Sequence, residues 1–147
     1  MSTATPRSDA DHCFVCGQAN PIGLRIRFAL DGDRCRGEYT SSTDHAGFDG
    51  VTHGGIVFAV LDDAMANWFF LQGARGYTAK SEIRYRNPMP IGASAVAECE
   101  LVRRKGRLVM LRARLVDASG TDDAGPTVFA ESDASFMLED FGRLEGQ

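Results

Sequence analysis

The sequence predicts a two-layer α+β domain in which a curved antiparallel sheet of five to six strands wraps around one long central helix. Two observations predict this arrangement. Residues 50–71 are apolar nearly all the way round a helix, which is typical of a helix that is buried on most sides. Before and after this stretch, several runs alternate apolar and polar residues with a period of two, which is typical of strands with one buried face.

The long helix is expected to begin at a His-Gly-Gly turn and to end before Gly73 and Gly76, because glycines commonly follow a last helical turn. It would contain about 16 residues and measure about 24 Å at ~1.5 Å per residue. Two adjacent carboxylates, Asp62 and Asp63, lie in the middle of this apolar stretch. A carboxylate is costly to bury unless it is paired, hydrogen-bonded or used in chemistry.

The strand-like runs lie on both sides of the helix in the sequence, and a turn at Asp31-Gly32-Asp33 joins the first two into a predicted hairpin. The length of 147 residues fits one domain with a real core, which we expect between a flexible tail at 1–12 and a second tail at 141–147. The domain would thus cover residues 13–140. The predicted strands cover residues 24–30, 35–40, 77–88, 93–102, 108–117 and 127–138.

The composition limits the class of protein. A hydrophobic content of 44% and a charged content of 24% are ordinary for a soluble globular protein. The formal net charge of -4 argues against nucleic-acid binding, which usually needs a basic surface. No apolar run approaches the roughly 20 residues that cross a bilayer, and the N-terminus does not resemble a secretory signal. We therefore expect a cytoplasmic protein with no membrane partner.

The cysteines raise the question of a metal site. Cys13 and Cys16 form a CxxC with His12 beside it, which supplies at most three ligands at close spacing, and a structural zinc site usually has four. Cys35 could approach this group in space, whereas buried free thiols are the simpler interpretation. In a reducing compartment these thiols would stay unpaired. We expect no metal.

The helix start and the first cysteines carry a resemblance to a known family. The opening CFVCGQANPIGL, the turn His53-Gly54-Gly55 and an acid nine residues after that histidine resemble hotdog-fold acyl-CoA thioesterases of the phenylacetate-degradation (PaaI-like) type. The resemblance spans about residues 13–138. It implies the hotdog fold and the hydrolysis of acyl-CoA thioesters to a carboxylic acid and free coenzyme A. It implies no cofactor, since coenzyme A is part of the substrate.

The same resemblance implies roles for individual residues. A backbone N–H at Gly54, with Gly55 adjacent, would polarise the thioester carbonyl, and Asp62 of the partner subunit would attack the carbonyl or activate water. Thr78, on the strand after the helix, would help to place that water. The chemistry is reasonable, because free N–H groups at a helix N-terminus stabilise the negative charge that develops on the carbonyl oxygen. A tight helix start packed on a neighbour is the structural alternative for the two glycines.

The other polar residues around this helix have more than one interpretation. Asp62 and Asp63 lie about 100° apart on a helix, so they cannot share one environment. We expect Asp63 to be structural, although both acids could instead pair with arginines of neighbouring strands. His53 is a candidate general base, or a hydrogen-bonding residue that holds the turn. Many members of the family carry an Asn about six residues before that histidine; here Gly47 stands near that place, and His45 or Asp49 could substitute for the amide.

One concentrated basic turn is the candidate substrate-binding segment. It could hold the phosphates of coenzyme A through charge-assisted hydrogen bonds, or it could be a solvated turn. Its four basic residues are Arg103, Arg104, Lys105 and Arg107.

We also expect the active site to be shared between subunits. Gly54 and Asp62 are about 12 Å apart along a helix axis, too far for one carbonyl to contact both. The predicted assembly is a homodimer or a dimer of dimers, a homotetramer, since pairing covers sheet edges. The alternative function is a non-catalytic or regulatory protein that binds acyl-CoA or fatty-acyl groups on the same fold.

Overall fold

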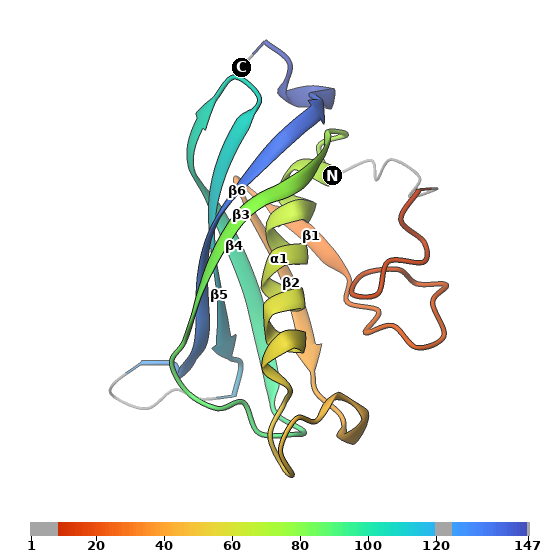
Figure 1. The fold of residues 1–147 in the computed structure, drawn as a ribbon, viewed down its shortest axis with the longest axis vertical. Helices are drawn as coiled ribbons and strands as arrows, with labels where there is room; N and C mark the ends of the chain where they lie inside the picture. The colour runs from red at the N-terminus through yellow and green to blue at the C-terminus, as the bar shows by residue number, and fades with distance from the viewer. Residues whose placement is uncertain (1–8, 120–124, 147) are drawn as a thin grey trace.

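The structure, a computed structural model, describes residues 9–119 and 125–146. Six strands form one antiparallel sheet in the order β1-β2-β4-β5-β6-β3, and the sheet curves around the single α-helix (Figure 1). The predicted α+β fold with one central helix is confirmed. The elements are β1 (Phe28–Asp31), β2 (Arg34–Thr40), the 3-10 helix η1 (Thr43–His45), α1 (Gly54–Phe70), β3 (Arg75–Tyr85), β4 (Ser94–Lys105), β5 (Leu108–Asp117), β6 (Val128–Asp140) and the 3-10 helix η2 (Gly142–Leu144).

The helix α1 fills the concave side of the sheet, and apolar side chains from both layers form the core. Leu61 and Met65 of α1 are fully buried, and Phe69 packs edge-on against Phe136 of β6 with ring centroids 5.4 Å apart. A helix enclosed in this way needs no polar stripe, which explains why its sequence lacks one. No helix of the described residues is long and apolar enough to cross a membrane.

The centre of this core is expected to dominate stability. Phe136 is 0% exposed, so Phe136→Ala removes a whole aromatic ring from a close-packed interior and leaves a cavity. We expect the free energy of unfolding to fall by about 3–5 kcal/mol, measured by urea denaturation. Ile22→Ala is the control, because Ile22 is 76% exposed and its loss is expected to change stability by less than about 0.5 kcal/mol. Equal effects of the two variants would contradict the described core.

The first predicted strand is shorter than expected, since β1 starts at Phe28 and not at residue 24. The segment before it pairs with the N-terminal loop: the Leu24 N–H donates to the Phe14 carbonyl at 2.8 Å, and the Ile26 N–H donates to the Val15 carbonyl at 2.9 Å. Arg25 between them has a left-handed backbone, with φ of 54°. Residues 24–27 therefore alternate apolar and polar side chains without forming a strand of the sheet. The alternation indicates which side chains are buried, but it does not specify the segment with which the backbone pairs.

The chain end also differs from the prediction of a tail at 141–147. Residues 142–144 form η2, and Leu144 is 2% exposed. The Arg104 guanidinium donates to the Leu144 carbonyl at 2.7 Å, so this segment is anchored to the end of β4. The predicted tail at 1–12 lies mostly outside the described residues, and within it Asp9 pairs with Arg75 at 2.7 Å.

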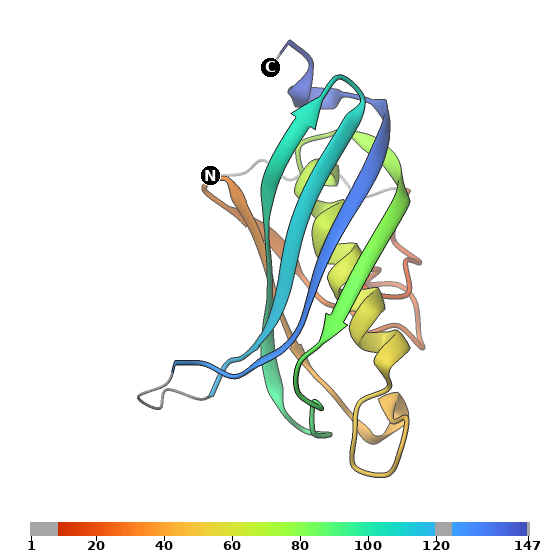
Figure 2. The same cartoon turned by 60° about the vertical axis from the view of Figure 1, so that its left-hand side comes forward.

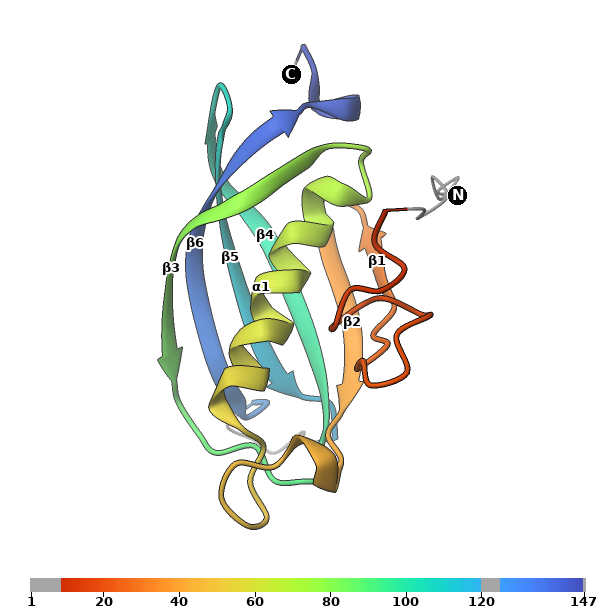
Figure 3. The same ribbon diagram turned by 45° about the vertical axis from the view of Figure 1, so that its right-hand side comes forward.

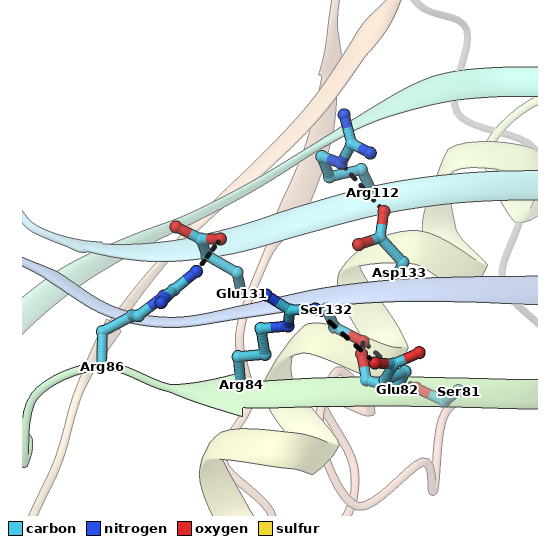
Figure 4. Close-up of polar contacts among 8 residues, drawn as sticks. All are labelled: Ser81, Glu82, Arg84, Arg86, Arg112, Glu131, Ser132 and Asp133. Atoms are coloured by element: carbon cyan, nitrogen blue, oxygen red, sulfur yellow. Dashed lines mark hydrogen bonds and ion pairs between the residues drawn. The ribbon is translucent and has the colours of Figure 1, made fainter.

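The outer face of the sheet, which Figure 2 brings forward, carries cross-strand ion pairs. Figure 4 shows Arg112 of β5 reaching Asp133 of β6 at 2.8 Å, and Arg86 reaching Glu131 of β6 at 3.4 Å. Successive side chains of a strand point to opposite faces, so the arginines that alternate with buried residues point away from α1. Arg34, Arg36, Arg112 and Arg114 thus pair with acids of neighbouring strands. None of the described ion pairs includes Asp62 or Asp63.

The strand β3 lies at one end of the sheet and pairs only with β6. Its other edge, along 11 residues, pairs with no strand of the described residues. The register of β3 against β6 shifts between Thr78 and Lys80, which marks a bulge. An unpaired edge of this length presents free N–H and C=O groups, and proteins commonly cover such edges by association.

Candidate active site

The His-Gly-Gly turn forms the N-terminus of α1 with His53 as its cap. The Gly55 N–H donates to His53 Nδ1 at 2.8 Å, and the Ile56 and Val57 N–H groups approach the His53 carbonyl at 3.0 and 3.1 Å. Among the hydrogen bonds of the described residues, none uses the Gly54 N–H. Of the two glycines proposed to polarise a carbonyl, Gly54 therefore has the N–H free for an incoming oxygen.

The imidazole of His53 accepts a hydrogen bond from the backbone of its own turn. Because Nδ1 accepts the Gly55 N–H, the ring carries its proton on the other nitrogen when neutral. A Cβ on Gly55 would lie 3.0 Å from His53 Nδ1, so a glycine here lets the ring approach the helix end. The sequence had offered two roles for His53, and this contact is the one in which the side chain holds the turn by a hydrogen bond. It uses Nδ1, the ring nitrogen that faces the helix.

The cap gives a prediction for stability. His53→Ala removes the acceptor for the Gly55 N–H, and loss of a side-chain cap costs about 1 kcal/mol of unfolding free energy. His53→Asn is the matched variant, because asparagine is among the preferred capping residues and should keep stability close to that of the wild type. Thermal or urea unfolding of the two variants measures the difference. Equal stability of the alanine and wild-type proteins would show that the cap contributes nothing.

A hydroxyl that sequence reasoning missed also contacts this turn. Tyr85, at the end of β3, donates its hydroxyl hydrogen bond to the Gly54 carbonyl at 2.8 Å. Its ring lies 3.5 Å from where a Cβ of Gly54 would stand. A cavity of about 620 Å³ opens beside the turn, lined by His53, Gly54, Phe48 and Tyr85 among others. No sequence motif marks Tyr85, since the contact depends on how β3 crosses the start of α1.

Asp62 and Thr78 lie together, as the resemblance implied that they would cooperate. Thr78 Oγ1 donates to Asp62 Oδ1 at 2.7 Å, from the exposed edge strand β3 to the middle of α1. Burial raises the pKa of Asp62 above its usual value, although the hydrogen bond from Thr78 acts in the opposite direction. The arrangement presents one oriented carboxylate in a partly buried place, which is a geometry for a general base or a nucleophile.

Asp63 points elsewhere and contacts the N-terminal loop. Its carboxylate accepts from Cys13 Sγ at 3.5 Å and from Asn67 Nδ2 at 3.0 Å. Burial raises the pKa of Asp63 to about 7. The hydrogen bond from Cys16 is the largest of the interactions that lower the pKa of the Cys13 thiol to about 5. The two neighbouring acids thus have different partners, in agreement with their 100° separation on the helix.

Neither His45 nor Asp49, the two residues that could substitute for the missing amide, lines the cavity beside the turn. His45 Nδ1 lies 2.9 Å from the Tyr39 hydroxyl and accepts from the Ser42 N–H at 3.3 Å, so this nitrogen is engaged away from the turn. Asp49 is exposed and does not line the cavity beside His53. The side-chain amide that does line that cavity is Asn87, which donates to the Val128 carbonyl at 2.8 Å.

The predicted basic turn is mostly strand, since Arg103, Arg104 and Lys105 are the last residues of β4 and only Arg107 lies in the turn to β5. This basic segment lies at the end of the molecule where α1 ends, opposite to the His-Gly-Gly turn (Figure 3). Arg104 donates to the Leu144 carbonyl, and Arg107 donates to the Leu138 carbonyl at 2.8 Å. Arg103 and Lys105 are exposed, and their side chains make no hydrogen bond or ion pair with the described residues. Within one chain, the structure therefore brings Asp62 to Thr78 and His53 to Gly54, and places the basic turn at neither pair.

Comparisons with known proteins agree with the fold. The structure is similar to the thioesterase superfamily protein RHA08564 (TM-score 0.76, 23% identity), covering 86% of this chain and 60% of that one, so the chain spans 60% of that protein's length. It is also similar to the PaaI protein of the phenylacetic acid degradation operon of E. coli (TM-score 0.71, 16% identity, 81% of this chain and 83% of that one). A hypothetical thioesterase of Streptococcus pneumoniae TIGR4, solved with coenzyme A, gives a TM-score of 0.70 at 14% identity, covering 79% of this chain and 87% of that one.

The likeness to these solved structures shows the hotdog fold of PaaI proteins, as the sequence predicted. No curated protein matches the sequence. The family model described as "Thioesterase superfamily" matches residues 49–124, more than half of the 147 residues, and this match includes the His-Gly-Gly turn, Asp62 and Thr78. The chain therefore belongs to the thioesterase superfamily.

Proposed function

We propose that the protein hydrolyses acyl-CoA thioesters to a carboxylic acid and free coenzyme A. The observation that carries this proposal is the Asp62 carboxylate, partly buried, held by Thr78 at 2.7 Å and paired with no cation among the described residues. A carboxylate in this setting is basic and oriented. The free Gly54 N–H at a helix N-terminus supplies the complementary group, a donor for the carbonyl oxygen.

In the proposed reaction the thioester carbonyl oxygen accepts a hydrogen bond from the Gly54 N–H. Asp62 either takes a proton from the attacking water or attacks the carbonyl carbon itself, and in the second route water then cleaves the resulting anhydride. In both routes the carbon–sulfur bond breaks and coenzyme A leaves as a thiolate that regains a proton. Water, one N–H and one carboxylate are sufficient for these steps, so we propose no cofactor.

The names of the similar structures support a coenzyme A ligand and the pair of residues. A protein of Streptococcus mutans was solved with acetyl CoA, and the Streptococcus pneumoniae thioesterase with coenzyme A. Two further structures of the latter carry alanine in place of an aspartate and of a threonine 16 positions later. Asp62 and Thr78 are separated by the same 16 positions.

We propose that two copies of the chain share each site. Gly54 and Asp62 belong to one continuous helix and are about 12 Å apart along its axis. One carbonyl therefore requires the Gly54 N–H of one subunit and Asp62 of the partner subunit. The unpaired edge of β3, which carries Thr78, is the surface that association would cover. A homodimer is the smallest assembly that builds this site and contains two copies of it, and a dimer of dimers would contain four.

We further propose that the basic turn contacts the phosphates of coenzyme A. The side chains of Arg103 and Lys105 are the ones available to bind phosphate, because the side chains of Arg104 and Arg107 already donate to backbone carbonyls. Guanidinium and ammonium groups bind phosphate oxygens through charge-assisted hydrogen bonds. In a shared site, the basic turn that binds the phosphates of a substrate can belong to a different subunit from the Gly54 that polarises its carbonyl.

The test is a panel of aryl, short-chain and medium-chain acyl-CoA substrates, with release of free thiol as the readout. We expect turnover of at least one substrate class by the wild-type protein. Binding of acyl-CoA without thiol release would instead support the non-catalytic alternative. Light scattering on the same sample measures the assembly, and a fully active monomer would contradict the shared site.

A further inference from the structure

The N-terminal loop, residues 9–27, brings two thiols against α1 beside the candidate active site (Figure 3). Cys13 Sγ lies 3.5 Å from Asp63 Oδ1, and Cys16 Sγ lies 3.7 Å from Asn67 Nδ2. The two sulfur atoms and a carboxylate oxygen of Asp63 all lie within 4.8 Å of one another. Three potential ligand atoms from segments fifty residues apart therefore converge on one point.

The CxxC turn holds its sulfurs in a preformed arrangement. The Cys16 N–H donates to Cys13 Sγ at 3.5 Å, and the Gly17 N–H donates to the Cys13 carbonyl at 2.9 Å. A Cβ on Gly17 would lie 2.4 Å from the Cys13 nitrogen, so only glycine fits this tight turn. The Cys16 N–H directed at the Cys13 sulfur favours the thiolate, which is the form of cysteine that binds metal ions.

Asp63 completes the cluster with a negative group that has no cation beside it. None of the ion pairs formed by residues 9–119 and 125–146 includes Asp63. Asn67, 2% exposed, donates its Nδ2 hydrogen bonds to Asp63 Oδ2 at 3.0 Å and to the Asp63 carbonyl at 2.8 Å. Such a hydrogen-bonded amide is a typical outer partner of a metal-binding carboxylate. Buried acidic groups are usually paired or bound to a metal ion.

We propose that Cys13, Cys16 and Asp63 bind one zinc-type divalent cation, which ties the N-terminal loop to α1. Two thiolates and one carboxylate are a ligand set that suits Zn²⁺. With Zn–S bonds of about 2.3 Å, tetrahedral sulfurs lie about 3.8 Å apart, so the two sulfurs, which lie within 4.8 Å of each other, need to approach by at most about 1 Å. A water molecule takes the fourth position, since Cys13 and Asp63 are both partly exposed.

This site differs from the one considered on the sequence, which had the CxxC and His12, with Cys35 as a residue that could approach them in space. The third ligand comes from the middle of α1, and no local spacing rule connects Asp63 to Cys13. A disulfide between the two cysteines would use only the sulfurs and would leave the Asp63 carboxylate with Asn67 alone. A cation uses all three donor groups. The proposed role is structural, and it is independent of whether the protein hydrolyses acyl-CoA.

The experiment uses the untagged full-length chain, purified under reducing conditions, stripped with a chelator and titrated with Co²⁺ and then Zn²⁺. We expect one ion per chain, a thiolate-to-cobalt charge-transfer band that Zn²⁺ abolishes, and a rise in Tm of at least about 3 °C with saturating Zn²⁺. Cys13→Ser and Asp63→Asn should each weaken Zn²⁺ binding by more than about 100-fold, since changes even to outer partners cost 10- to 100-fold.

The matched control is Cys99→Ala, which removes a buried thiol of the same chain outside the cluster and should bind Zn²⁺ like the wild type. Asp63→Asn is nearly isosteric, so it remains informative if the cysteine variants fail to fold. Binding without a charge-transfer band, equal binding by Cys13→Ser and wild type, or a stable Cys13–Cys16 disulfide with no binding by the reduced chain would each overturn the proposal.

Discussion

Replacement of Asp62 by asparagine is expected to lower kcat for acyl-CoA hydrolysis by about 100- to 10,000-fold, the usual contribution of a positioned general base. Asparagine keeps the shape of the side chain and can still accept the hydrogen bond from Thr78, so substrate binding and folding should change little. The variant loses the basic carboxylate oxygen. Burial raises the pKa of Asp62, so it increases the affinity of this oxygen for a proton. Steady-state thiol release, combined with binding of an acyl-CoA measured by calorimetry, separates the two effects.

The control for this variant is Asp63→Asn, on the same helix and one residue away. Asp63 contacts Cys13 and Asn67 and does not contact Thr78, so its replacement should leave kcat within a few-fold of the wild-type value at a temperature where both proteins are folded. Full activity of Asp62→Asn, or an equal loss in the two variants, would show that the assignment of the catalytic acid is wrong even if the protein is a thioesterase.

Replacement of Gly54 by proline is expected to remove the carbonyl-polarising N–H while leaving the helix intact. Gly54 is the first residue of α1, the position where proline is best tolerated in a helix. The preceding residue, His53, has ψ of 131°, an extended value that a following proline accepts, whereas a helical ψ would clash with the proline ring. We expect kcat to fall by about 100- to 1,000-fold, as for loss of one oxyanion donor, with Tm unchanged or slightly higher.

Gly54→Ala is the matched comparison, because alanine keeps the N–H and adds only a Cβ. That Cβ would stand 3.5 Å from the Tyr85 ring, an ordinary contact, so the fold should accept it. The alanine variant should retain most of the activity that the proline variant loses. If both variants are equally impaired, the glycine serves close approach of the substrate, and the N–H is not the important group.

The sequence determined the fold and the helix start because both depend on local information. Alternating runs and one apolar helix predict a sheet around a helix whatever the exact strand ends, and the error at residues 24–27 changed only the length of β1. A free N–H at Gly54 follows from the first turn of any helix, which has N–H groups without intrahelical acceptors. Here the cap residue His53 takes up the Gly55 N–H and leaves that of Gly54.

Tertiary structure alone decided which side chains meet. Thr78 reaches Asp62 because of the register and the bulge of β3, and Tyr85 reaches Gly54 because β3 crosses the start of α1. The side chain of Asp63, one residue after Asp62, instead contacts Cys13 in the N-terminal loop, fifty residues earlier in the sequence. The sequence placed Asp62, Asp63 and the CxxC separately, but contacts between distant segments depend on sheet register and loop path, which no local pattern specifies.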